Sequence, residues 1–277
     1  MLAIALPIHA EEICDDYSNC IELTTPSPRI ISLYGALNEM LIALDKSELI
    51  VARTKSDSEI KEIAHLPEIG THMQPNPELI VAASPDVILQ LSGRSEALTQ
   101  TSNLRKFGLN TLCFDITNFD QLCSVMLRLG KLVGKPDEAN AIVKGWCNRL
   151  EKLQAEAPGK GKKIYFESRS GNLLAAGQGN MVNAIINATG AQNSMAVPKK
   201  FVRINEEALL LANPDICLIQ KGPMNPAPIL PKNRAGFADL SCVKNNKMYI
   251  VEESLFSRPG PNSITAAETL ANLIRQD

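Results

Sequence analysis

Three residues that could ligate haem iron stand in the first third of the chain. Tyr34 follows a short apolar segment, and His72 and Met73 are neighbours in the loop-forming stretch GTHMQP. Because His, Met and Tyr all serve as axial ligands of haem, one hypothesis is that these residues capture haem. The alternative, which we favour, is that His72 is a solvated loop residue and that Met73 packs on the wall of a binding site.

Motifs for enzyme chemistry are missing from the sequence. It has no G-x-S-x-G, H-E-x-x-H, G-x-x-x-x-G-K-[ST] or G-x-G-x-x-G pattern, and its three His residues leave few candidates for a general base. The seven Cys residues include no C-x-x-C pair, so we expect no thiolate zinc site and no other metal ligated by the protein. An α/β enzyme that acts on a small molecule stays open as the alternative function, with no catalytic residue to name.

The composition argues against two classes of partner. The net charge is −2 over 277 residues and the pI is near 6.0, which disfavours nucleic acid or an anionic membrane surface as the main partner. Apolar content of 45% and charged content of 21% are typical of a folded globular chain. No apolar run approaches the roughly 20 residues that a transmembrane helix needs.

The first ten residues, MLAIALPIHA, are apolar and end in a small residue before two Glu residues. This pattern predicts the end of a secretory signal peptide, and therefore an exported, periplasmic protein. A disordered apolar tail or a first strand is the alternative. Cys14 and Cys20 would suit a disulfide in an exported protein, although the sequence leaves their pairing open. The residues predicted to be buried small hydrophobic side chains are Cys113, Cys147 and Cys217.

One sequence pattern occurs twice, as NPELIVAASPDVILQ at 76–90 and NEEALLLANPDICLI at 205–219. Each copy has an Asn, an acidic residue two positions later, an apolar helical turn, a Pro-Asp pair and a short apolar run. The repetition predicts two similar lobes, and a cleft between lobes is a preferred place to bind a small molecule. The matching positions, 129 apart, are Asn76 and Asn205, Glu78 and Glu207, Pro85 and Pro214, and Asp86 and Asp215.

Each copy of the pattern predicts a short helix followed by a buried strand. Asn76 and Asn205 are good N-caps because the side-chain oxygen can accept a free backbone N–H of the first turn. Pro77 suits the first helical position, and Pro85 and Pro214 should end the helices at the preceding residue. The apolar runs that follow are typical of strands in a parallel sheet covered on both faces.

Strand and helix patterns alternate along the chain, which predicts an α/β fold with parallel sheets. We predict an N-terminal segment with a signal remnant at 1–25, an N-terminal lobe at 26–135, a long inter-lobe helix at 136–157 and a C-terminal lobe at 158–277. The other predicted strands are 29–33, 49–52, 111–114, 163–167 and 248–251, and the other predicted helices are 35–44, 95–107, 118–133, 180–188 and 265–274.

The segment PRIISLYGALNEMLIALD at 28–45 resembles the opening of the helical-backbone class of ABC-transporter substrate-binding proteins. Four further pieces match in order: the two repeats, GQGNMVNAIINATGAQN and SRPGP. The resemblance covers about residues 26–275. It implies two Rossmann-like lobes joined by one long helix, and a cargo such as a ferric siderophore, haem or cobalamin, or less often an oxyanion. It implies no enzyme activity and no cofactor other than a bound metal chelate.

The resemblance also implies a membrane partner. In relatives, one Glu on each lobe docks onto arginines of the ABC-importer permease dimer, and the matching positions here are Glu78 and Glu207. A monomer of this kind would meet the membrane through the permease only. The alternative is local, because a Glu in the first turn of a helix is stabilised by roughly 0.3–1 kcal/mol through the helix dipole. That effect does not explain why both residues occupy the same place in the two repeats.

The ligand site is expected at the carboxyl ends of the strands, between the lobes. The cations there fit an anionic ligand such as a ferric siderophore or the propionates of haem. By the resemblance, Phe201 takes the place of a ligand-stacking aromatic. Arg258 could instead fix the RPGP turn, and each other residue could be an ordinary solvated loop side chain. The predicted ligand-binding residues are Tyr34, His72, Met73, Arg94, Arg169, Gln178, Phe201, Lys221, Phe256 and Arg258.

Overall fold

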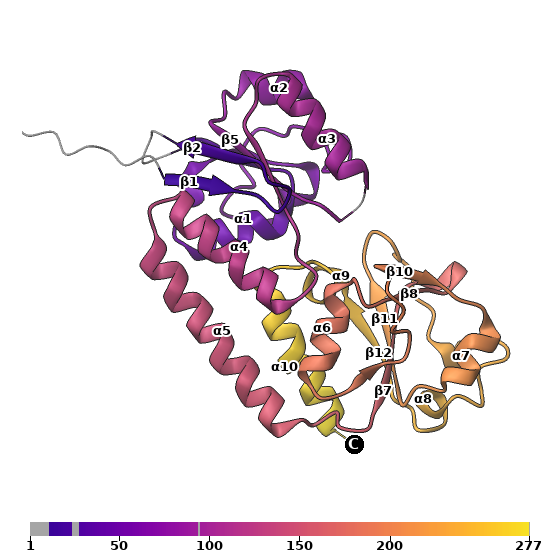
Figure 1. Ribbon diagram of the computed structural model, residues 1–277. Helices are drawn as coiled ribbons and strands as arrows, with labels where there is room; N and C mark the ends of the chain where they lie inside the picture. Colours follow the sequence, from indigo (N-terminus) through magenta and orange to yellow (C-terminus); the bar gives the residue numbers. More distant parts are fainter. Residues whose placement is uncertain (1–10, 24–27, 94, 277) are drawn as a thin grey trace, which may run out of the picture. The chain divides into compact units, whose positions relative to one another are not determined.

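The computed structural model describes residues 11–23, 28–93 and 95–276, so the predicted signal segment and Arg94 lie outside the described residues. The chain divides into two compact units (Figure 1). Unit 1 comprises Met1–Ile116 and Cys123–Val143, and unit 2 comprises Thr117–Leu122 and Lys144–Asp277. No helix within the described ranges is long and apolar enough to cross a membrane.

Unit 1 is built on a four-stranded parallel sheet with the order β4-β3-β5-β6. The short apolar runs that predicted strands are buried almost throughout, as expected for a sheet covered on both faces. The strands are β3 (Ile30–Ser32), β4 (Ile50–Ala52), β5 (Val87–Leu91) and β6 (Thr111–Phe114); the helices are α1 (Gly35–Ala43), α2 (Pro77–Ala82), α3 (Ser95–Lys106) and α4 (Phe119–Leu132), the last beginning in unit 2.

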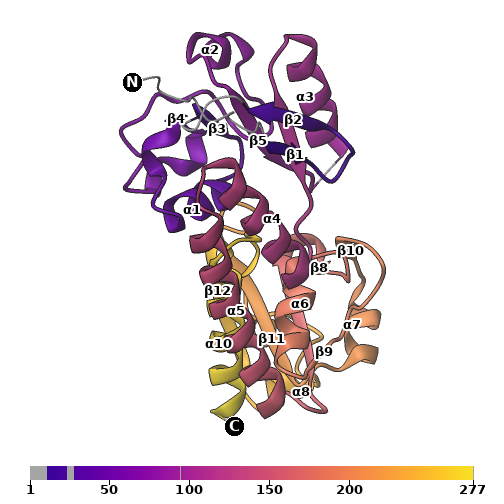
Figure 2. The same ribbon diagram turned by 60° about the vertical axis from the view of Figure 1, so that its left-hand side comes forward.

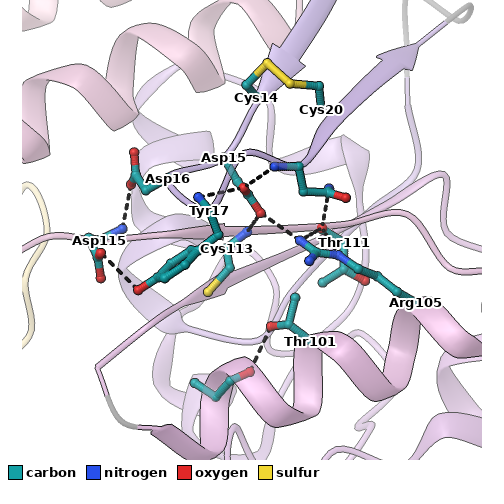
Figure 3. Close-up of polar contacts among 12 residues, drawn as sticks. Cys14, Asp15, Asp16, Tyr17, Cys20, Thr101, Arg105, Thr111, Cys113 and Asp115 are labelled. Carbon is teal, nitrogen blue, oxygen red and sulfur yellow. Dashed lines mark hydrogen bonds and ion pairs between the residues drawn. A yellow bond between two sulfur atoms is a disulfide. The ribbon is translucent and has the colours of Figure 1, made fainter.

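An N-terminal hairpin that the sequence did not predict precedes this sheet. Strands β1 (Glu11–Cys14) and β2 (Cys20–Leu23) pair in antiparallel fashion, and a disulfide joins Cys14 to Cys20. In the turn between them, Asp15 accepts backbone N–H groups from Tyr17 and Asn19 at 2.8 and 2.9 Å. Its other oxygen accepts from Arg105 of α3 at 2.7 Å (Figure 3). The carboxylate therefore orders the turn and ties it to a helix of unit 1.

The same turn covers the open edge of β6, the last strand in the sheet order. Asn19 donates to the carbonyl of Thr111 at 3.1 Å, and the backbone N–H of Asp16 donates to the carbonyl of Cys113 at 3.2 Å. The carboxylate of Asp16 accepts the N–H of Asp115 at 2.7 Å (Figure 3). These contacts take the place of a neighbouring strand, which protects an edge that would otherwise present unpaired backbone groups.

The two repeats fold alike at their helix N-termini. In unit 1, Asn76 accepts the backbone N–H groups of Glu78 and Leu79 at 3.0 and 3.3 Å at the start of α2. In unit 2, Asn205 accepts that of Ala208 at 2.9 Å at the start of α7 (Glu206–Ala212). Both predicted N-caps are therefore confirmed, and each satisfies backbone donors that the first helical turn leaves free.

Each Pro-Asp pair fixes the strand after it to the neighbouring strand. Asp86 accepts the N–H of Arg29 at 2.7 Å through its carboxylate and donates its own N–H to the carbonyl of Arg29 at 2.8 Å. Asp215 makes the same two contacts with Lys163, at 2.7 and 2.8 Å. Arg29 directly precedes β3 and Lys163 begins β7 (Lys163–Arg169), so the two Asp residues set the strand register in the same way in both units.

Unit 2 has a mixed sheet, whereas the sequence predicted parallel strands. The order is β10-β8-β7-β11-β12, with β9 also beside β7. Strands β7, β9, β11 and β12 are parallel, but β8 runs antiparallel to β7 because a tight turn around Leu173, at φ 47°, reverses the chain. The edge strand β10 pairs in antiparallel fashion with β8. The strands are β7 (Lys163–Arg169), β8 (Leu174–Ala176), β9 (Gln192–Asn193), β10 (Phe201–Arg203), β11 (Ile216–Lys221) and β12 (Met248–Glu252).

A second disulfide lies in the core of unit 2. It joins Cys217 of β11 to Cys242, and both residues are fully buried. The sequence predicted the burial of Cys217 but missed its bond, because nothing in its apolar surroundings marks a partner 25 residues away. Cys113 is a buried free thiol, as predicted, whereas Cys147 is only half-buried. The further helices are α6 (Met181–Ala188), α8 (Ser241–Lys244), α9 (Glu253–Phe256) and α10 (Asn262–Arg275).

The long helix α5 (Pro136–Glu156) agrees with the predicted range to one residue (Figure 2). The boundary between the two units falls within it, after Val143. Its unit 2 portion buries Trp146 and is attached to α10 by ion pairs. In one of them, Nε and Nη2 of Arg149 donate to the two carboxylate oxygens of Glu268 at 2.8 and 2.6 Å. This two-point contact fixes the side of α5 that faces α10.

Candidate functional site

In unit 1 the predicted site residues meet at the carboxyl end of β3. Tyr34 follows this strand and is the N-cap residue of α1. Its ring meets that of His72 edge to face, with the ring centroids 5.9 Å apart and the planes at 81°. Met73 follows directly, and its carbonyl accepts a hydrogen bond from Gln100 of α3. Tyr34 and His72, predicted from different stretches of the sequence, therefore lie together, and they and Met73 are all half-buried.

A tight loop presents His72 and Met73. Gly70 and Pro75 form an isolated antiparallel bridge, and inside it the N–H of Gln74 donates to the carbonyl of Thr71 at 3.1 Å. Gly70 has φ +96°, and a Cβ there would lie 2.6 Å from the carbonyl oxygen of Gln74. Only glycine fits this position without strain. The loop is therefore closed at its base and carries the two side chains at its tip.

In unit 2 two predicted cations stand at the carboxyl ends of neighbouring strands. Ile219 of β11 pairs with Glu167 of β7, and Lys221 and Arg169 each lie two residues beyond that pair. Both side chains are exposed, and neither has an ion-pair partner among the described residues. Two positive charges without an ion-pair partner in the described part of the chain thus lie at the same edge of the sheet, where ligands of α/β proteins bind.

Below this edge lies a buried ion pair that the sequence analysis missed. The carboxylate of Glu167 is fully buried and accepts from two nitrogens of Arg234 at 2.6 and 2.8 Å. The hydroxyl of Tyr165 donates to it at 2.9 Å. Burial, together with the neighbouring Glu167 charge, raises the pKa of Tyr165 well above its usual value. The available signal was a Glu inside an apolar strand, since a buried carboxylate needs a partner.

Hydrogen bonds extend from this pair across the sheet edge. Asn225 donates to Ser170 at 3.0 Å and to the carbonyl of Gln220 at 2.8 Å. The side chain of Gln220 in turn donates to Glu253 at 2.8 Å and accepts from Ser257. The ends of β7 and β11 are thus held by connected polar side chains. Such a network gives the cations above it a rigid base.

The structure places the remaining predicted residues differently. Gln178 is exposed just after β8, and Phe201 is half-buried at the start of β10. Phe256 is 1% exposed and its ring stacks on Phe166 at 6.3 Å, so it is a core residue and the prediction that it lines a ligand site was wrong. Arg258 stands in the turn before α10, where its carbonyl accepts from Ser263 at 3.4 Å.

Unit 2 also holds an open cavity of about 540 Å³. Its wall carries cations from Arg203 and Arg234, a carboxylate from Glu206, and the ends of the turn from Ser170 to Leu173. None of the predicted ligand-binding residues that the structure describes lines it. The size is that of a small-ligand pocket, but charges of both signs on its wall give no clear selection between cations and anions.

In the described ranges, one group of three residues has side chains of types that can ligate a metal and that lie close together. It consists of Glu12, Cys14 and Cys20, whose potential ligand atoms lie within 4.8 Å of one another. Both sulfurs belong to the disulfide of the hairpin. Since a metal is ligated by thiolates, this group cannot act as a metal site while the disulfide is closed.

Glu78 and Glu207 are exposed in the first turns of α2 and α7. Neither has an ion-pair partner among the residues that the structure describes. Each of the two helices lies at the periphery of its own unit (Figure 1). The repeat thus gives each unit one unpaired carboxylate at a corresponding place.

Comparison with known proteins gives consistent matches over most of the chain. A Bacillus subtilis protein named as an uncharacterized ABC transporter substrate-binding lipoprotein, YvrC, is 26% identical over 95% of this chain and 85% of its own length. The vitamin B12-binding protein of Salmonella typhimurium is 23% identical over 90% and 91%. A crystal structure described as an ABC-type Fe3+-hydroxamate transport system, from Saccharomonospora viridis, has a TM-score of 0.77 at 19% identity, covering 96% and 99%.

The sequence pattern of one family spans both units. The family is described as periplasmic binding protein, and its pattern matches residues 30–255, from β3 to α9. Its members bind substrates for transport, which confirms the predictions of an extracytoplasmic location and of a role without enzyme activity. With two α/β units and this match, the chain belongs to the periplasmic binding protein family and is a substrate-binding protein of membrane transport.

Proposed function

We propose that the protein binds an anionic metal chelate, of which a ferric siderophore is the best example, and delivers it as a monomer to an ABC-importer permease dimer. The observation that carries this choice is the pair of exposed cations, Arg169 and Lys221, at one edge of the unit 2 sheet. The names of two relatives support the class, since vitamin B12 and Fe3+-hydroxamates are both metal chelates.

The chemistry of the two units suggests different tasks for them. In a ferric siderophore, iron is already fully chelated, so the protein needs only to hold the outer shell. Arg169 and Lys221 can donate charge-assisted hydrogen bonds to anionic groups of that shell. In unit 1, the edge-to-face rings of Tyr34 and His72, with Met73 next to His72 in the sequence, suit contact with an apolar or aromatic group.

A binding experiment tests the proposal directly. Double replacement Arg169→Ala/Lys221→Ala should weaken a ferric catecholate siderophore by about 1.5–3 kcal/mol per lost charge-assisted contact, measured by fluorescence quenching or calorimetry. Arg203→Ala, which removes a cation of the same unit from the cavity wall, is the matched control. Tight binding of cobalamin that is unaffected by the double change would overturn the preference for an anionic chelate, because the periphery of cobalamin is mostly neutral amide.

Haem is the second candidate, because the edge-to-face pair of Tyr34 and His72 brings two axial-ligand types together. If haem is the cargo, His72→Ala should shift the Soret band and weaken binding. If a siderophore is the cargo, the same change should leave affinity almost unchanged. The absorption spectrum and mass of the molecule that copurifies with the protein would decide between the two.

Delivery requires a contact with the permease. We assign it to Glu78 and Glu207, one in each unit, because an exposed carboxylate without a partner can form bidentate pairs with arginine. Their equal places in the two repeats match a partner made of two equal subunits. The residues contribute to docking and not to ligand binding, so their replacement should lower uptake while leaving ligand affinity intact.

A further inference from the structure

We infer that the permease contact in each unit is a composite patch, in which exposed aliphatic side chains of α2 and α7 supply binding energy beside the docking carboxylate. The α2 patch consists of Glu78, Leu79 and Val81, and the α7 patch of Glu207, Leu210 and Leu211. The inference rests on the proposed delivery to a permease, and it adds the apolar half of the surface to the acidic half.

The first evidence is that the two helices distribute their apolar side chains in the same way, with one buried and the next exposed to solvent. Each has one buried anchor, Ile80 in α2 and Leu209 in α7, and both anchors are 0% exposed. The next residue of each is exposed, Val81 at 50% and Leu210 at 38%. These two pairs occupy matching positions of the repeat, so the fold itself presents an aliphatic side chain at the same point of both units.

The second evidence is that α2 and α7, although short, each expose a further aliphatic side chain to solvent. Leu79 is 46% exposed and Leu211 is 88% exposed, in helices of 6 and 7 residues. An exposed leucine alone requires no explanation. Val81 and Leu210 each lie three positions after the unpaired carboxylate of Glu78 or Glu207, so each shares a helix face with that carboxylate. Leu211 lies on the same face of α7, whereas Leu79 lies on the other side of Glu78 from Val81. Each helix thus presents exposed aliphatic side chains around one carboxylate.

The charge decides what kind of partner fits. An unpaired carboxylate at an apolar contact needs a cation opposite it, because burying it without one is costly. Symmetric self-association would place Glu78 or Glu207 near its own copy and would leave the charge uncompensated. A partner that presents an arginine surrounded by apolar side chains satisfies both halves of the patch. The two carboxylates and the pair of Val81 and Leu210 occupy matching positions in the two units, which suits a partner with two equal surfaces, as in a permease dimer.

The two halves should also act differently on the kinetics. Complementary charges steer encounter and fix orientation, and their effect falls with salt. Burial of Val81, Leu210 and their neighbours is not screened by salt and should mainly slow dissociation. The composite surface therefore predicts an affinity for the permease that falls as salt rises and then levels at a value set by the apolar side chains.

The test compares three double variants, Val81→Ser/Leu210→Ser, Glu78→Gln/Glu207→Gln and a control, by their binding to the permease in nanodiscs at low and at high salt. Val81→Ser/Leu210→Ser should weaken docking about tenfold at both salt concentrations, with faster dissociation. The control Leu98→Ser/Ile250→Ser removes one exposed aliphatic side chain from each unit away from α2 and α7, at 36% and 48% exposure. It should bind like the unaltered protein. Ligand affinity and melting temperature should be unchanged in both serine variants.

The outcomes separate this inference from the proposed function. If Val81→Ser/Leu210→Ser docks normally while Glu78→Gln/Glu207→Gln does not, the carboxylates act alone and the composite patch is wrong. If neither double variant changes docking, the assignment of α2 and α7 to the permease contact fails as a whole. If Val81→Ser/Leu210→Ser loses affinity only at low salt, the aliphatic side chains do not supply the part of the binding free energy that salt leaves unscreened. That result would also overturn the inference.

Discussion

At the scale of single residues, the buried pair of Glu167 and Arg234 shows where the sequence stops being informative. The Glu sits in a predicted apolar strand, KIYFE, so its burial was readable from the sequence. Its partner is 67 positions away in a loop without any periodic pattern. No local rule connects the two, because the contact depends on how the chain returns to the sheet. The same reason explains why Cys242 was not identified as the partner of Cys217.

Removing Arg234 should lower the stability of the folded protein. Arg234→Ala leaves the carboxylate of Glu167 buried beside the hydroxyl of Tyr165 without a cation, and we expect a loss of about 3–5 kcal/mol in the free energy of unfolding. The double variant Glu167→Gln/Arg234→Met removes both charges and should recover most of that loss. Urea unfolding of the three proteins measures it. A single variant as stable as the unaltered protein would mean that water reaches this carboxylate.

Tyr165 predicts how stability depends on alkaline pH. Its pKa is raised in the folded protein, so at high pH the unfolded chain loses a proton that the folded chain retains. The stabilising contribution is therefore complete below about pH 10, the ordinary tyrosine pKa, and is lost as the pH rises above it. Tyr165→Phe should make the fall of stability above that pH shallower. Tyr17→Phe is the control, since Tyr17 of unit 1 also has a raised pKa but is 39% exposed, whereas Tyr165 is fully buried.

At the scale of elements, segments with a clear apolar pattern and clear end signals were predicted well, and segments without them were not. Strand β6 and helix α5 agree with the predicted ranges to within one residue, because strong patterns and clear end signals mark them. Strands β8 and β10 were missed because their three residues each carry no clear end signals, and β8 is antiparallel to β7 because of the turn at Leu173. The hairpin of β1 and β2 was missed because its order derives from contacts to β6, far away in the sequence.

The hairpin disulfide should act locally. Cys14→Ser/Cys20→Ser removes a loop closure of 6 positions, worth roughly 2 kcal/mol in the chain-entropy estimate. Because the turn it closes covers β6, hydrogen exchange at the backbone amides of Cys113 and Asp115 should become faster, while amides in unit 2 should not change. Cys217→Ser/Cys242→Ser is the contrasting variant, and it should act on unit 2 alone. Unchanged exchange at β6 would show that Asp15 and Asp16 hold the turn without the disulfide.

At the scale of the whole molecule, the repeat was the most informative part of the sequence. It predicted two units of similar construction, and the structure shows that its Asn and Asp residues make matching contacts in both, while its Glu residues stand in the first turns of the two helices. The candidate site could be predicted less completely. Strand ends located Tyr34, His72, Arg169 and Lys221, but the polar network beneath the two cations depends on loops around Asn225 and Arg234 that carry no motif.

Transport by the whole protein should depend on one carboxylate from each unit. Glu78→Lys and Glu207→Lys place a cation where we expect a permease arginine, and like charges in contact cost several kcal/mol. Each change alone should therefore abolish uptake while leaving ligand affinity nearly unchanged, because both residues lie on exposed first turns of their helices and not at the carboxyl edge of a sheet. Glu206→Lys, one position from Glu207 on the same helix, controls for the change in net charge. Uptake and ligand binding are measured in parallel. Equal loss of both activities would show that these residues act on the ligand or the fold, and a harmless Glu207→Lys beside a damaging Glu78→Lys would restrict docking to unit 1.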